Sequence, residues 1–143
     1  DPNAGLAIPY DFKRDVFQRV QFDYDSSELR AGDLQLVEQV AVSLQQNPTH
    51  LLLVEGHCDE RGTEEYNLSL GERRAIAVVN ELLRLGVGQQ RLRTATHGEK
   101  IPVDESDTPA ARAKNRRGEF VLVVPKANVA TAPAQPLDFA PQK

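Results

Sequence analysis

An uninterrupted apolar run, LLLV at residues 51–54, is the feature that most constrains how this chain can fold. Four apolar residues in a row leave no polar face, a pattern typical of a β-strand that is covered on both sides or nearly so. Such a strand requires neighbouring strands for its backbone hydrogen bonds and further elements over its faces. The chain has 143 residues, which is long enough for one domain with a real hydrophobic core around this strand.

Helix and strand patterns alternate on both sides of this run. Apolar residues at helical spacing over 34–44 predict a helix, which Pro48 stops. Thr63 is a suitable N-cap for a second helix, which Gly86 ends. Alternating or apolar stretches predict further strands at 20–24, 92–96 and 120–124, and residues 111–115 predict a short helical turn.

The order of these elements is β-α-β-α-β, then a loop and a last strand. We expect an α/β (α+β) two-layer sandwich, β-α-β-α-β-β, in which two main helices pack on a four-stranded mixed sheet. This domain is predicted to span residues 18–125. Residues 1–17 have weak periodicity and are predicted to form an N-terminal arm with one helical turn near residues 13–15. Residues 126–143, rich in alanine and proline, are predicted to form a disordered tail.

Composition and charge narrow the range of partners. The net charge is −4 with both signs spread along the chain, which argues against nucleic-acid binding, since that requires a basic face. The basic cluster at 112–117 is local, and we expect a solvated turn with either Arg116 or Arg117 directed inward. No apolar run approaches the roughly 18–20 residues that span a bilayer. The chain contains no methionine, so we expect a processed chain in which any membrane attachment is through an N-terminal segment.

The segment that follows the apolar run carries an acid, and the next predicted helix carries an arginine. Asp59 lies just past the end of the predicted strand, where open α/β sheets tend to bind ligands. Asn67 and Arg74 are seven residues apart, two helical turns, and so share one face with Leu70 between them. A carboxylate can accept hydrogen bonds from an amine, and a guanidinium can hold a carboxylate. The spacing therefore permits a clamp for a zwitterionic ligand.

The same acid and arginine also fit a purely structural role. Asp59 and Arg74 could pair with each other, or with Arg61 and Glu72, because structural ion pairs are common in folded domains. From the residues alone, the clamp and the ordinary ion pair remain open alternatives.

Catalytic and metal sites are not expected from the spacing of the polar residues. A nucleophile and its base must meet within about 3 Å, and the adjacent His57 and Cys58 point to opposite faces at a strand end. A metal site drawn from His50, His57, Cys58, Asp59 and His97 lacks any paired-ligand spacing. We therefore expect a chain that is not an enzyme, with no catalytic residue, no metal and no cofactor.

Four separated segments carry a family resemblance: VQFDYDSSEL, GHCDERGTEEYNLSLGERRA, THGEKIPV and AKNRRGEFVL. Together they resemble the OmpA-like peptidoglycan-binding domain, in the form found in peptidoglycan-associated lipoproteins (Pal) of the Tol–Pal system. The resemblance covers about residues 18–125, and four motifs in the right order are far more specific than one short pattern. It implies a periplasmic, non-catalytic domain that binds the diaminopimelate of peptidoglycan stem peptides and tethers the outer membrane to the cell wall.

The resemblance also implies which residues bind the ligand. The family's acid that binds diaminopimelate matches Asp59, and its arginine matches Arg74, fifteen residues later. The full set that it implies for the pocket is Asp59, Arg74, Asn67, Leu70, Phe22, Asp23, Thr63 and Arg116. Position 58 departs from the family, because it is Cys where the family usually has Thr, and this implies the loss of a hydroxyl contact.

A periplasmic protein–protein interaction module is the alternative function. The resemblance implies a Tol-system partner, and the same surface could bind that partner without direct contact to peptidoglycan. The family's acylated N-terminal cysteine is absent from this chain, so attachment to the outer membrane through a lipid anchor is an expectation from the resemblance alone.

Overall fold

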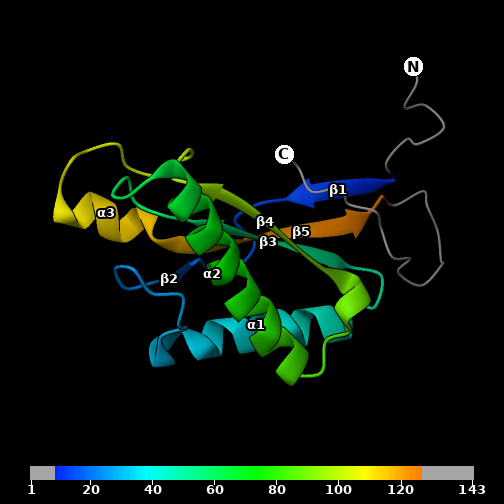
Figure 1. Ribbon diagram of the computed structural model, residues 1–143. Coiled ribbons are helices and arrows are strands. Elements are labelled where there is room, and N and C mark those ends of the chain that lie inside the picture. Colours follow the sequence, from blue (N-terminus) through cyan, green and yellow to red (C-terminus); the bar gives the residue numbers. More distant parts are fainter. Residues whose placement is uncertain (1–8, 127–143) are drawn as a thin grey trace, which may run out of the picture.

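The computed structural model describes residues 9–126, which fold around a mixed β-sheet (Figure 1). The strands in this range are β1 (Tyr10–Lys13), β2 (Val20–Gln21), β3 (Leu51–His57), β4 (Leu92–Gly98) and β5 (Arg117–Pro125). Their order is β1-β5-β3-β4, and β2 also pairs with β5. β3 and β4 are parallel, whereas β5 is antiparallel to β1, β2 and β3. All seven residues of β3 are buried, as expected for the central apolar strand.

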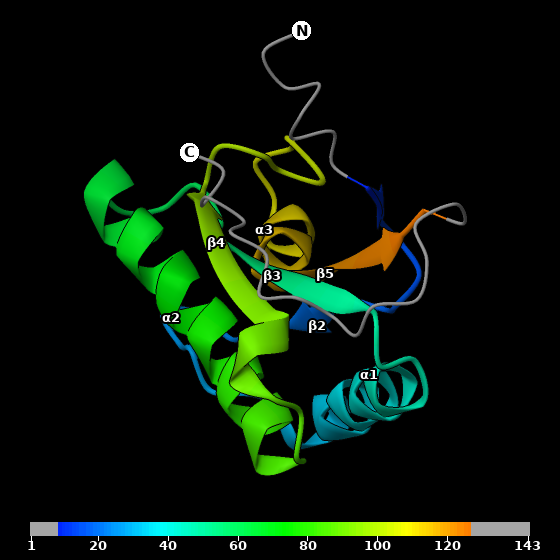
Figure 2. The same ribbon diagram turned by 90° about the vertical axis from the view of Figure 1, so that its right-hand side faces the viewer.

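Two long helices, α1 (Leu34–Gln46) and α2 (Glu64–Arg84), cover one face of this sheet. Figure 2 shows α2 running beside β4 and β3, with α1 at the end of the sheet where β3 begins. The apolar residues of both helices pack in one core with alternate residues of β3 and β5 and with Val20 and Phe22. A third helix, α3 (Pro109–Asn115), precedes β5, and short 3-10 helices lie at Ala31–Asp33 and Gln89–Arg91.

The predicted two-layer α/β fold is confirmed, with differences at the edges of the sheet. Residues 10–13, in the predicted N-terminal arm, form strand β1 and pair with the end of β5, so the helical turn predicted near residues 13–15 is wrong. The strand predicted at 20–24 is shortened to β2 because the chain leaves the sheet after residue 21. Residues 1–8 of the arm, and all of the predicted tail except residue 126, lie outside the described residues.

Two glycines let α2 approach β3 closely. A Cβ atom at Gly56 would lie 1.7 Å from the main-chain oxygen of Gly71, and one at Gly71 would lie 2.3 Å from the Thr96 hydroxyl. A side chain at Gly56 would require a shift of the backbone, and one at Gly71 would displace the Thr96 side chain. This contact fixes the start of α2 against the carboxyl end of β3, where the candidate site lies.

Candidate functional site

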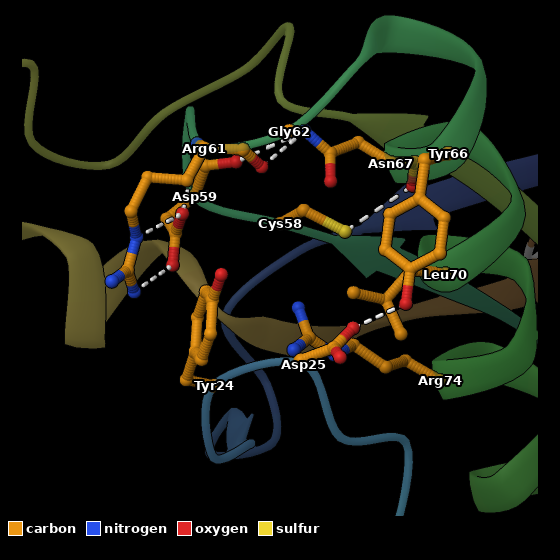
Figure 3. Close-up of a pocket in the computed structure, with 10 residues that line it drawn as sticks. All are labelled: Tyr24, Asp25, Cys58, Asp59, Arg61, Gly62, Tyr66, Asn67, Leu70 and Arg74. Carbon is orange, nitrogen blue, oxygen red and sulfur yellow. Dashed lines mark hydrogen bonds and ion pairs between the residues drawn. The ribbon is translucent and has the colours of Figure 1, made fainter.

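A pocket of about 150 Å³ opens where β3 ends and α2 begins, facing the loop that follows β2. Figure 3 shows its lining residues, which come from these three segments: Tyr24, Asp25, Cys58, Asp59, Arg61, Gly62, Tyr66, Asn67, Leu70 and Arg74. Four of the eight residues predicted for the ligand pocket are among them: Asp59, Asn67, Leu70 and Arg74. The pocket therefore contains both the acid and the arginine of the predicted clamp.

Asp59 is a buried carboxylate held by arginine side chains. It is 4% exposed, and its two oxygens accept hydrogen bonds from Nε and Nη2 of Arg61 at 3.1 and 2.9 Å. A further bond comes from the Arg61 main-chain N–H at 3.0 Å, and Nη1 of Arg116 lies 3.4 Å from Oδ2. Burial alone would raise the pKa of Asp59, but the bonds and charge of Arg61, helped by Arg116, outweigh it and lower the pKa. The group is therefore ionised at neutral pH.

Arg74 is a buried cation held by the main chain rather than by an acid. It is 1% exposed, and it donates to the carbonyl oxygens of Ser26 (2.8 Å), His57 (2.9 Å) and Asp23 (3.0 Å). Burial is the main reason that its pKa is lowered from the usual value. A guanidinium has five N–H donors, and these bonds use one on each nitrogen. These three bonds leave two further N–H groups on the guanidinium, and Arg74 lines the pocket.

The ordinary ion pair, predicted as the alternative to a clamp, is present for Asp59 but not for Arg74 in the described part of the chain. Asp59 pairs with Arg61, as that alternative allowed, whereas Arg74 forms no ion pair with any acid in the described part of the chain. Glu72 instead accepts a hydrogen bond from the hydroxyl of Thr94 at 2.9 Å. The acid and the arginine of the pocket are therefore not paired with each other.

Asn67 and Thr63 position the loop and the helix that frame the pocket. Thr63 caps α2 by accepting a hydrogen bond from the main-chain N–H of Tyr66 at 3.1 Å, as its sequence position predicted. The buried amide of Asn67 donates to the main-chain oxygen of Arg61 at 3.0 Å and to the carboxylate of Glu99 at 2.9 Å. Asn67 therefore holds the turn that carries Asp59, while Thr63 does not line the pocket.

Phe22 and Asp23 lie behind the pocket rather than in its lining. Phe22 is fully buried, and the guanidinium carbon of Arg74 lies 5.3 Å from the centre of its ring. The carboxylate of Asp23 is exposed and pairs with Arg30 at 2.7 Å, so only its main-chain oxygen reaches Arg74. Both residues therefore act on the pocket through the position of Arg74.

Arg116, the C-cap of α3, and Arg117, which begins β5, direct their side chains to different faces of the sheet. Arg116 is the one directed toward the pocket, where it reaches Asp59 and donates to the main-chain oxygen of Phe22 at 2.9 Å. Arg117 lies on the opposite face of the sheet and pairs there with Glu119.

Comparison with known proteins identifies the family of this chain. Residues 21–116 match the OmpA family. The chain belongs to that family. A peptidoglycan-associated lipoprotein from Brucella melitensis is 43% identical to this OmpA-family chain over 122 residues, which cover 83% of the chain and 73% of that protein.

Solved structures agree with this assignment. The crystal structure of the peptidoglycan-associated lipoprotein from Burkholderia pseudomallei has a TM-score of 0.72 at 39% identity, covering 85% of this chain and 96% of that one. The C-terminal domain of Helicobacter pylori MotB has a TM-score of 0.68 at 23% identity, covering 73% and 83%, which shows a shared fold. Membership in the OmpA family supports the prediction of a binding domain rather than an enzyme. Among the helices in residues 9–126, none has both the length and the apolar character needed to cross a membrane.

Cys58, the position where the resemblance implies threonine, forms a hydrogen bond inside the OmpA-family domain. Its thiol is 3% exposed and donates to the main-chain oxygen of Asn67 at 3.2 Å. Burial is the main cause of its raised pKa, so the group is a neutral thiol rather than a thiolate. A thiol is a weak donor, so this bond is weaker than one from a hydroxyl at the same place would be.

Six of the ten lining residues of the OmpA-family domain were not predicted from its sequence as ligand-pocket residues. Cys58, Arg61 and Gly62 flank Asp59 in the chain, whereas Tyr24, Asp25 and Tyr66 come from other segments. The hydroxyl of Tyr66 bonds to the carboxylate of Asp25, and the ring of Tyr24 lies 3.9 Å from the guanidinium carbon of Arg61. Together they form an exposed rim around the mouth of the pocket (Figure 3). The bend that brings Tyr24 and Asp25 there depends on a positive φ of 52° at Asp25, which no periodicity indicates.

The residues considered as metal ligands from the sequence lie in different places. Cys58 and Asp59 line the helix-side pocket, and His50 precedes β3 at its other end. His57 and His97 lie on the opposite face of the sheet, where their rings stack with centroids 5.0 Å apart. Burial is the main cause that lowers the pKa of His57 to about 3. His57 and Cys58 thus point to opposite faces, as their adjacency at a strand end predicted.

Proposed function

We propose that this OmpA-family domain binds peptidoglycan by holding the diaminopimelate of an uncrosslinked stem peptide. Diaminopimelate presents an α-amine and a carboxylate at the end of its side chain. In the proposed complex Asp59 accepts hydrogen bonds from the amine, and Arg74 donates to the carboxylate. The domain would then act as a reversible, non-catalytic tether between the outer membrane and the cell wall.

The observation that carries this proposal is a buried acid and a buried arginine that line one small pocket without pairing with each other. The carboxylate of Asp59 and the guanidinium of Arg74 are 4% and 1% exposed, and both line the same 150 Å³ pocket. A small pocket that contains one acid and one arginine suits a charged head group with both an amine and a carboxylate. Hydrogen bonds to charged groups contribute about 1.5–3 kcal/mol each, so two such contacts support reversible binding.

Arg61 occupies the place that the ligand amine would take. Its side chain is 40% exposed and covers Asp59 from the mouth of the pocket. Exchange of this arginine for an amine would keep the buried carboxylate paired throughout. The side chain of Arg61 can leave into solvent, whereas Asp59 is fixed at the end of β3.

Relatives support the location that the proposal requires. Several proteins that match over most of this chain are named peptidoglycan-associated lipoproteins, in Brucella, Agrobacterium and Burkholderia. We therefore infer a place in the bacterial envelope, on the periplasmic side of the outer membrane, with an N-terminal lipid anchor as the attachment. The Tol–Pal system is the assembly in which this tether would act.

The test is co-sedimentation of the protein with purified peptidoglycan sacculi. We expect Asp59→Asn to reduce the bound fraction at least tenfold, because the neutral amide no longer balances the ligand amine. Arg74→Ala should have a similar effect, and free meso-diaminopimelate should release wild-type protein from the sacculi. Unchanged binding by both variants would contradict the proposal.

Two neighbouring residues provide matched controls. Glu60 and Arg73 carry the same charges one residue away, but neither lines the pocket. Glu60→Gln and Arg73→Ala should therefore bind sacculi at the wild-type level. Circular dichroism of each variant separates a binding defect from a folding defect.

A Tol-system protein that binds the same surface is the second candidate. The exposed aromatic rings of Tyr24 and Tyr66, at 60% and 43%, lie beside the pocket and suit a protein interface. If Tyr24→Ala and Tyr66→Ala abolish binding to a Tol-system periplasmic protein but leave sacculus binding intact, the rim serves protein contacts and the pocket serves peptidoglycan.

A further inference from the structure

Three side chains with metal-binding atoms gather on the face of the sheet opposite α1 and α2. Glu55 and His57 come from β3 and His97 from β4. One ligand atom from each lies within 4.8 Å of the other two. They line a cavity of about 470 Å³ that is separate from the helix-side pocket.

Strand geometry brings these three side chains together. Glu55 and His57 are two residues apart on one strand and therefore point to the same face. The pairing of β3 with β4 shifts at this point, from Gly56 opposite Thr96 to His57 opposite Gly98. His97 is the extra residue of this bulge, and bulges commonly redirect a side chain next to a functional site.

His57 is the member of this cluster whose buried ring nitrogens call for an explanation. It is 2% exposed, and within the described residues neither of its ring nitrogens has a hydrogen-bond partner. Buried polar atoms are rarely left without a partner, and such cases call for a specific cause such as a ligand or an ion. Nε2 of His97 lies 2.9 Å from the Glu55 carboxylate, so the unpartnered ring stands beside an ionised acid and a second imidazole.

We propose that Glu55, His57 and His97 form a binding site for a divalent transition-metal ion, with zinc the best fit. Two imidazoles and one carboxylate are a common set of three protein ligands for zinc, with water in the fourth position. The open cavity supplies that water. Zinc–nitrogen bonds of about 2.0–2.1 Å require ligand atoms roughly 3.3 Å apart, so atoms that now lie within 4.8 Å of one another must approach by up to about 1.5 Å. His97 can make this movement, because its side chain is 20% exposed.

The charges around the cluster set how tightly it can bind a cation. Arg14 donates to both oxygens of Glu55, at 2.6 and 3.2 Å, and so competes directly with a metal ion. Its side chain is 56% exposed and can turn into solvent. Arg19 and Arg117 also line the cavity, but both are paired with Glu119. Displacement of Arg14 is therefore the step that opens the site.

Calorimetric titration of the untagged chain with zinc tests the site. We expect one ion per chain and an affinity that falls at least tenfold in His97→Ala and in Glu55→Gln. These two variants are preferred to His57→Ala, because replacement of the buried His57 could prevent folding. Arg14→Ala should bind zinc severalfold more tightly, since the competing cation is removed.

His50→Ala is the matched control, because this histidine lies at the opposite end of β3. Its zinc affinity should equal that of the wild type, and cobalt titration should give a visible absorption band that His97→Ala loses. No binding of zinc by the wild type, or equal affinity in wild type and His97→Ala, would overturn the site. Weaker binding in Arg14→Ala would do so as well.

Discussion

The two faces of the sheet hold their charges differently at the carboxyl end of β3. On the helix side, Arg74 is bonded to three main-chain carbonyl oxygens and is 1% exposed. On the opposite face, Arg14 reaches Glu55 with a side chain that is 56% exposed. A charge held by main-chain atoms is fixed by the fold, whereas one held by a flexible side chain can be exchanged for a ligand. Arg61 over Asp59 belongs to the exchangeable kind, although it lies on the helix side.

The largest loss of stability is expected at Gly56, where β3 contacts α2 on the helix side of the sheet. Gly56→Ala would force a Cβ atom against the main-chain oxygen of Gly71, so β3 and α2 must separate. Overpacking of this kind costs about 3 kcal/mol in the free energy of unfolding, and contact with backbone leaves little room for relief. Urea denaturation measures this loss. Gly32→Ala is the control, because nothing lies within 4 Å of its added Cβ and its stability should change by less than about 0.5 kcal/mol. Equal stability of both variants would contradict the close approach.

Removal of each arginine tests the contrast between the two faces directly. Arg74→Ala leaves the buried carbonyl oxygen of His57 and the partly buried ones of Ser26 and Asp23 without their charged donor, and we expect a loss of about 3 kcal/mol in the free energy of unfolding. Arg14→Ala removes an ion pair that is half open to solvent and should cost at most about 1 kcal/mol. Thermal and urea unfolding of the two variants under identical conditions give the comparison. Similar losses in both would show that main-chain anchoring confers no special stability.

Arg61→Ala tests whether Arg61 is an exchangeable partner of Asp59, because the substitution leaves the Asp59 carboxylate open to the ligand. If Arg61 is an exchangeable occupant, its removal should strengthen binding to sacculi by roughly fivefold, which corresponds to about 1 kcal/mol for a partly exposed ion pair. The bound fraction in co-sedimentation is the measurement. Arg30→Ala, which removes the exposed pair with Asp23, should leave binding unchanged. Weaker binding of Arg61→Ala would instead mean that Arg61 itself contacts the ligand.

The smallest effect concerns Cys58. Cys58→Thr replaces a weak thiol donor with a hydroxyl toward the main-chain oxygen of Asn67, and we expect a gain of about 0.5 kcal/mol in stability. Cys58→Val has the shape of threonine without the donor and should lose stability relative to Cys58→Thr. Urea denaturation of the three proteins decides between hydrogen bonding and packing as the role of this position.

Much of the fold could be predicted because it depends on local pattern. The apolar run at 51–54 became the fully buried β3, and Thr63 caps α2 as its position indicated. Strand β1 could not be predicted from periodicity, because its four residues are mostly exposed and become a strand only by pairing with β5. The shortened β2 has a similar cause, since the chain turns away toward the positive φ at Asp25.

In the candidate site, too, some features could be predicted from the sequence and others could not. Helical spacing correctly put Asn67, Leu70 and Arg74 on one face, and the strand end put Asp59 beside them. That Asp59 is paired while Arg74 is not could not be predicted, because it depends on the paths of Arg61 and of three main-chain segments. The cluster of Glu55, His57 and His97 was missed because linear spacing does not record which residues two adjacent strands bring together.

The amino-acid sequence by itself determined the layers of the domain, the helix face that carries Arg74, and the family to which the chain belongs. These follow from periodicity and from motifs of local spacing. Only the tertiary structure decided which charges remain unpaired, which arginine of the 116–117 pair faces the pocket, and which histidines meet across β3 and β4. Such outcomes depend on strand register, on a single bulge and on the close contact of two glycines, and these are set by packing between segments that are distant in the chain.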